Sequence, residues 1–107
     1  MEWLTKLYGQ TVALDTAPVI YYIEEHEDYI RLLDPFFADL DDGRFRAITS
    51  TLTLLEVLVQ PLRRGDESLA HQYNDILLCS PNISTLPITY ATAQEAAELR
   101  ARYNKNS

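Results

Sequence analysis

The chain has 107 residues, 47% of them hydrophobic, one cysteine and a formal net charge of −7. This length suits one domain, over residues 1–107, and the apolar content suits a packed core rather than wholesale disorder. The acidic balance argues against holding nucleic acid by bulk electrostatics, although it permits an enzyme that meets phosphates through a bound cation. One cysteine excludes an internal disulfide, and no apolar run reaches the ~20 residues of a membrane helix. We therefore expect a soluble, cytoplasmic domain with no membrane partner.

Strand-like and helix-like segments alternate along the chain. Short apolar, partly β-branched runs predict strands, and amphipathic runs bounded by Thr, Ser, Pro or Gly predict helices. Strands are expected over 11–14, 45–49 and 83–88, and helices over 19–27, 28–40, from 50 or 51 to about 63, 67–78, and from 89 or 92 to about 104. This order predicts an α/β fold of three layers, in which a parallel sheet is covered by helices on both faces.

Two acids stand out against this pattern. Asp15 directly follows the first strand, so its carboxylate is expected in the crevice beyond the carboxyl ends of the strands, where ligands bind in open α/β sheets. Glu56 lies within the apolar run Leu52–Val59, and a helix that is apolar on nearly every face is expected to be buried. A buried carboxylate needs a partner, and for two acids brought together a divalent cation is a natural one.

Each acid also has a simpler interpretation. Asp15 is equally well placed to cap the helix that follows it. Glu56 can reach solvent at the edge of its helix, or pair with an arginine such as Arg44 or Arg46. A third alternative treats Asp15 as a phosphoacceptor at the end of a strand, but Thr16-Ala17-Pro18 supplies none of the additional acids that such sites need.

The segment Val12-Ala13-Leu14-Asp15-Thr16-Ala17-Pro18-Val19-Ile20-Tyr21-Tyr22-Ile23-Glu24 resembles the opening of a PIN-domain nuclease. Ile48-Thr49-Ser50 followed by Leu54-Leu55-Glu56-Val57 resembles the second acidic motif of that family. The resemblance runs from about Val12 to Asn104, and similar chains include the VapC-like toxin ribonucleases of toxin–antitoxin pairs.

The resemblance implies a PIN-like fold and hydrolysis of RNA at a cluster of three or four acids that binds Mg²⁺ or Mn²⁺. Asp15 and Glu56 match the first two acids, as catalytic and metal-binding residues. Thr16 and Ser50 are candidates to hold a bound water or a phosphate oxygen of the substrate, and each also suits a helix cap.

The chain departs from the family pattern at its end. The family's third acid and the further acid on its last strand have no counterpart before Ser107, and Glu95 and Glu98 are expected on a solvated face. We therefore expect a C-terminally incomplete domain that lacks the last helix and strand, with uncovered apolar surface, weak cation binding and little activity.

Two functions follow from these expectations. The first is a metal-dependent ribonuclease, the toxin of a toxin–antitoxin pair. The second is a non-catalytic interaction module that binds an antitoxin-like protein or a second copy of itself through the uncovered face.

Overall fold

The computed structural model describes residues 1–103, except for the side chains of residues 92, 96, 99, 100 and 103. After a short N-terminal helix that was not anticipated, three strands and five α-helices follow in the order that the sequence predicts. The elements are α1 (Glu2–Thr5), β1 (Thr11–Ala13), α2 (Thr16–Ile23), α3 (Ile30–Asp41), β2 (Arg46–Ser50), α4 (Thr51–Arg63), α5 (Glu67–Asn74), a π-helical turn η1 (Asp75–Cys79), β3 (Ile83–Leu86) and α6 (Tyr90–Tyr103). The predicted end of the last helix near Asn104 falls outside the described residues.

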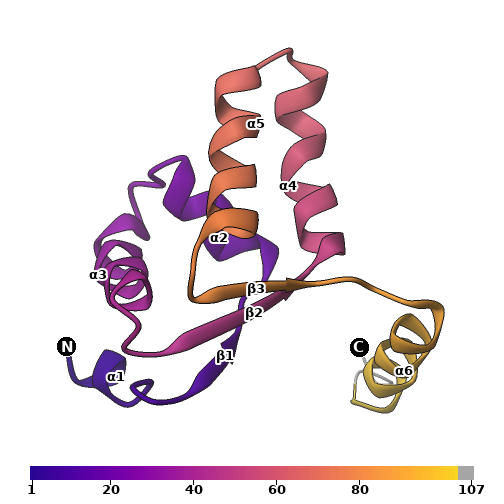
Figure 1. Ribbon diagram of the computed structural model, residues 1–107, viewed down its shortest axis with the longest axis horizontal. Coiled ribbons are helices and arrows are strands. Elements are labelled where there is room, and N and C mark those ends of the chain that lie inside the picture. Colours follow the sequence, from indigo (N-terminus) through magenta and orange to yellow (C-terminus); the bar gives the residue numbers. More distant parts are fainter. Residues whose placement is uncertain (104–107) are drawn as a thin grey trace.

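The strands form a parallel sheet in the order β1-β2-β3, which confirms the mixed α/β class. Side chains of the central strand alternate between buried and exposed positions: Ala47 and Thr49 are buried, whereas Arg46 and Ile48 are exposed. Figure 1 shows α2, α4 and α5 standing on one side of the sheet, with α6 beyond the end of β3 and apart from the other helices. Apolar surface is thus left uncovered, as expected, with Leu86 on β3 50% exposed.

The core lies between the sheet and the helices. Its centre is Tyr73 of α5, which is fully buried, and the aromatic rings of the core pack tightly, with Phe37 stacked on Tyr22 at 4.1 Å between centroids. Further buried members come from the chain between α1 and the start of β3: Leu4, Leu14, Val19, Leu40, Phe45, Ala47, Val57, Leu77 and Ile83. The N-terminal helix therefore belongs to the core through Leu4. The described helices include none that is long and apolar enough to cross a bilayer.

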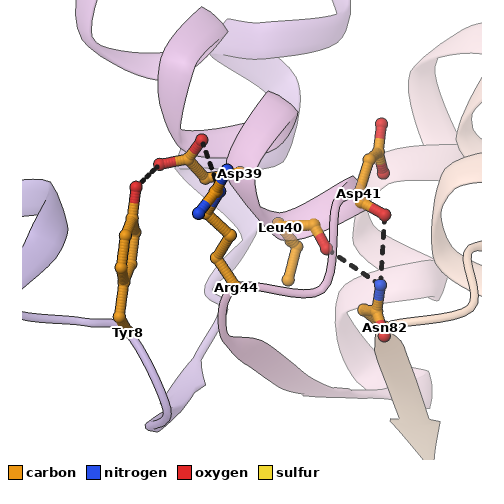
Figure 2. Close-up of polar contacts among 6 residues, drawn as sticks. All are labelled: Tyr8, Asp39, Leu40, Asp41, Arg44 and Asn82. Carbon is orange, nitrogen blue, oxygen red and sulfur yellow. Dashed lines mark hydrogen bonds and ion pairs between the residues drawn. The ribbon is translucent and has the colours of Figure 1, made fainter.

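A polar network closes the end of the fold opposite the candidate site (Figure 2). Asn82, just before β3, donates hydrogen bonds from its side-chain amide to the backbone oxygens of Leu40 (3.0 Å) and Asp41 (3.2 Å) at the end of α3. The Tyr8 hydroxyl donates to the carboxylate of Asp39 (2.7 Å), which also lies 3.9 Å from Arg44. The bonds from Asn82 add acceptor contacts to carbonyls at the end of α3, and the whole set attaches both the N-terminal segment and β3 to α3.

Candidate functional site

Asp15 lies where β1 gives way to α2, and it is exposed. It is the N-cap of α2, and its Oδ1 accepts a hydrogen bond of 2.8 Å from the backbone N–H of Thr16. The backbone N–H of Leu14 bonds the carbonyl of Ile48, so the chain leaves β1 still paired to the central strand. The capping interpretation of Asp15 is therefore correct. One carboxylate oxygen is engaged in the cap, and the group as a whole remains accessible from solvent.

Glu56 lies in the second turn of α4 and is exposed, so the expectation that its helix buries it is wrong. The helix buries Thr53 and Val57, whereas Leu52 and Leu55 are 49% and 60% exposed. Other elements cover one side of α4 only, and the apolar residues on its outer side stay in contact with solvent. Glu56 sits at the border of these two sides, where a carboxylate keeps its hydration at little cost.

The hydroxyl of Thr16 connects the two acids. Its Oγ1 donates a hydrogen bond of 2.7 Å to Oε2 of Glu56, and lies 3.4 Å from Oγ1 of Thr53. Its backbone N–H meanwhile donates to Asp15. Thr16 at the start of α2 thus holds one carboxylate from each predicted motif, although Asp15 and Glu56 are 41 positions apart in the sequence. The predicted acids are brought together, although through Thr16 rather than in direct contact.

A cleft of about 410 Å³ opens beside Asp15, at the carboxyl ends of β1 and β2. Its polar wall contains Ser50, which caps α4 by accepting a hydrogen bond from the backbone N–H of Thr53 (3.4 Å). It also contains Thr49, whose Oγ1 is buried and has no hydrogen-bond partner among the described residues. A buried hydroxyl without a partner is uncommon and calls for a water or an ion close by. The remaining lining residues are Ala13, Leu14, Ile48 and Thr53.

The cleft therefore offers the carboxylate of Asp15, an oxygen donor of the kind that hard divalent cations prefer, and Thr16 holds Glu56 nearby. No third acid joins them in the described part of the chain, where no three His, Cys, Asp or Glu side chains gather closely enough to hold a metal. Glu95 and Glu98 on α6 are exposed, as expected. Mg²⁺ commonly binds through one or two carboxylates and keeps several waters, so this donor set fits such an ion.

A second hollow, of about 260 Å³, lies on the other side of Glu56, between α2 and α4; we call it the α2–α4 groove. The Tyr73 hydroxyl donates a hydrogen bond to Glu24 at one side of it. Burial is the larger cause, and the hydrogen bond to Glu24 the next, of a rise in the pKa of Tyr73 above its ordinary value. The groove is lined by Ile20, Glu24, Glu56, Val57, Gln60, Pro61, Arg64 and Tyr73.

Sequence reasoning did not select Glu24, Gln60 or Arg64 as site residues. The signal was present in the spacing: residues 16, 20 and 24 recur at four-residue intervals on α2 and its cap, and residues 56, 60 and 64 do so on α4 and its cap. Residues four apart share one face of a helix. The sequence alone does not show that these faces of α2 and α4 oppose each other.

Two carboxylates connected through Thr16 thus lie at the carboxyl edge of a parallel sheet, beside a cleft between strand ends, which is where ligands bind in open α/β sheets. Comparison with known families makes this more specific. The PIN domain family model matches residues 12–107, so the chain belongs to the PIN domain family. No curated protein and no solved structure is similar enough to the chain to count as a match.

Family membership confirms the resemblance seen in the two sequence motifs. It indicates a nuclease-type function directed at RNA, and proteins with this domain generally depend on divalent metal ions. Asp15 and Glu56 lie in the matched region at the places where the resemblance positions the first two acids.

Proposed function

We propose that the chain is a metal-dependent ribonuclease in which Asp15 and Glu56 form the core of the active site. The observation that carries this proposal is the pairing of the two acids through Thr16 at the carboxyl edge of the sheet. The VapC-like character of the two motifs supports a role as the toxin of a toxin–antitoxin pair, acting in the cytoplasm and held in check by an antitoxin protein.

Each site residue has a distinct task in this proposal. Asp15 and Glu56 supply carboxylate oxygens for Mg²⁺ or Mn²⁺, which when bound activates water and stabilises charge on the phosphate. Thr16 is a positioning residue, because its hydroxyl holds Oε2 of Glu56. Ser50 lines the cleft beside Asp15, where its hydroxyl suits a bound water or a phosphate oxygen. Two carboxylates give weak cation binding, and we expect low activity.

Mn²⁺ titration by calorimetry tests the metal site directly. We expect the wild type to bind the ion and Asp15→Asn and Glu56→Gln each to abolish the binding signal. Glu67→Gln is the matched control, since Glu67 is an exposed acid in the first turn of α5. Loss of binding in only one of the two variants would mean that they do not form one site. Cleavage of single-stranded RNA in Mn²⁺, absent in both variants, extends the test to activity.

A second function, that of an interaction module, is favoured by a specific surface. The outer side of α4 carries Leu52, Leu55, Val59 and Leu62, which we call the α4 stripe, with exposed fractions of 49%, 60%, 36% and 62%. The spacing of three and four residues is the seam of a coiled coil, and exposed apolar seams mark protein contacts. The proposed occupant is a second copy of the chain, with an apolar helix of an antitoxin as the competing one.

Sedimentation of the wild type and of Leu55→Lys at micromolar concentration tests this surface. We expect a wild-type dimer and a monomeric variant of unchanged stability, because Leu55 contributes little to the core. A wild type that sediments as a clean monomer would contradict self-association, and would leave an antitoxin-like protein as the partner to be tested.

A further inference from the structure

The α2–α4 groove has the polarity and size of a subsite for a single nucleobase. Its volume of about 260 Å³ lies just below the roughly 300–1,000 Å³ of pockets for drug-sized ligands. The half-buried side chain of Ile20 provides an apolar edge against which a planar ring can pack, and the buried Val57 and Pro61 also line the groove. Glu56 lines the groove at one end and is also held by Thr16, so the groove adjoins the proposed catalytic site.

The polar groups at the other end are a carboxylate and a guanidinium. Glu24 accepts a hydrogen bond from Tyr73, which fixes one of its oxygens and leaves further acceptor positions on the carboxylate. The ion pairs of the described chain join Arg44 to Asp39 and His71 to Asp75, and Arg64 takes part in neither. The guanidinium of Arg64 therefore keeps its donors for a ligand.

We infer that this groove binds a guanine base of single-stranded RNA and so gives the ribonuclease a base preference next to the cleaved bond. Guanine presents two neighbouring N–H donors on its Watson–Crick edge and two neighbouring acceptors, O6 and N7. A carboxylate such as Glu24 accepts from the first pair, and an arginine such as Arg64 donates to the second in a bidentate fork. Gln60 lies between Glu56 and Arg64 on α4 and can serve either edge.

The other bases satisfy this pair of groups less completely. Adenine and cytosine each offer one exocyclic amino donor to the carboxylate, and uracil offers a single ring N–H. The spacing along α4 places Arg64 eight residues from Glu56, about 12 Å along a helix that rises 1.5 Å per residue. The groove thus recognises the base of a nucleotide close to the scissile bond and does not hold the phosphate that is attacked. This inference rests on the proposed ribonuclease function.

Binding in EDTA separates the groove from the catalytic step. Four short uridine-rich RNAs, which differ only in one central base, are titrated with the full chain while hydrolysis cannot proceed. We expect the guanine RNA to bind about 10-fold more tightly than the others, a preference that one good bidentate contact supplies. Equal binding of all four RNAs, a preference for another base, or no binding would overturn the inference.

Two variants assign the preference to named groups. Arg64→Lys keeps the charge and loses the fork, and Glu24→Gln loses the carboxylate; each is expected to remove most of the guanine preference. Arg63→Lys and Glu27→Gln are the matched controls, because these exposed residues lie outside the groove. A preference that survives in both groove variants would place recognition elsewhere.

The same RNAs in Mn²⁺ then report cleavage. A guanine preference in binding without any cleavage would retain the subsite and reject the ribonuclease. Cleavage with no base preference would reject the subsite and retain the ribonuclease.

Discussion

The hydroxyl of Thr16 is the contact on which the pairing of the two acids depends, and Thr16→Val removes it while keeping the shape of the side chain. The deleted hydrogen bond is short, 2.7 Å, and its acceptor is a carboxylate, so it belongs to the stronger class of protein hydrogen bonds. Removing a group that orients a metal ligand typically lowers metal affinity about 10–100-fold. We expect a loss of this size for Mn²⁺, equivalent to roughly 1.4–2.8 kcal/mol at 1.4 kcal/mol per tenfold change.

The effect on folding should be much smaller than the effect on the metal. Glu56 is exposed, so its carboxylate recovers hydrogen bonds from water when Thr16 no longer donates one. A net contribution of about 1 kcal/mol is the usual value for one hydrogen bond, and we expect the free energy of unfolding to fall by no more than that. The contrast between a large loss of affinity and a small loss of stability distinguishes a positioning residue from a purely structural one.

Calorimetric titration with Mn²⁺ and urea unfolding of the same preparations measure both quantities. Thr16→Ser, which restores the hydroxyl, is the control and should bind Mn²⁺ nearly as well as the wild type. The reasoning is refuted if Thr16→Val binds Mn²⁺ with unchanged affinity, or if the serine variant loses as much affinity as the valine variant.

Two further predictions concern the scaffold. Asn82→Ala deletes both hydrogen bonds to the end of α3 (Figure 2) and should lower the free energy of unfolding in urea by about 1–2 kcal/mol. Asn82→Asp should be destabilised as much, because a carboxylate cannot donate a hydrogen bond. Unchanged stability in either variant would contradict a capping role. The pKa of Tyr73 is raised in the folded state by burial and by Glu24. The contribution of Tyr73 to stability is therefore complete below the ordinary tyrosine pKa of about 10 and is lost as the pH rises above that value. The free energy of unfolding then falls by at most about 1.4 kcal/mol per pH unit. Urea unfolding at a series of alkaline pH values should show a shallower decline in Tyr73→Phe than in the wild type, with the remaining decline due to Tyr8 and Tyr22, whose pKa values are also raised; identical declines would contradict the assignment.

The features that the sequence predicted are those encoded within a few neighbouring residues. An apolar run followed by Asp15 and a helix opened by Ser50 are local patterns, and both appear where expected. The parallel sheet follows from their alternation, because helical crossovers between strands leave little other choice. The order of elements and the edge of the sheet where the acids meet were therefore predictable before any contact was known.

The exposure of Glu56 was not predictable in the same way. Burial of a helix face depends on which elements cover it, and this is decided by residues far away in the sequence. The run from Leu52 to Val59 suggests burial all round, yet the covered side of α4 includes Thr53, and the uncovered side holds leucines. The hydrogen bond between Thr16 and Glu56 was unpredictable for the same reason, since it needs α2 and α4 side by side.

The proposed chemistry is held by the packing of two helices rather than by loops. Val19 of α2 is fully buried and Val57 of α4 nearly so, and both belong to the core cluster of a fold in which these two helices contact each other. The polar residues that flank them then meet in order along the groove, from the Thr16–Glu56 hydrogen bond at one end to Glu24 and Arg64 at the other. Sites on packed helices hold their geometry better than sites on loops. A change that shifts α2 against α4 should therefore weaken cation binding and base preference together, whereas a change in either set of polar residues should affect only one of them.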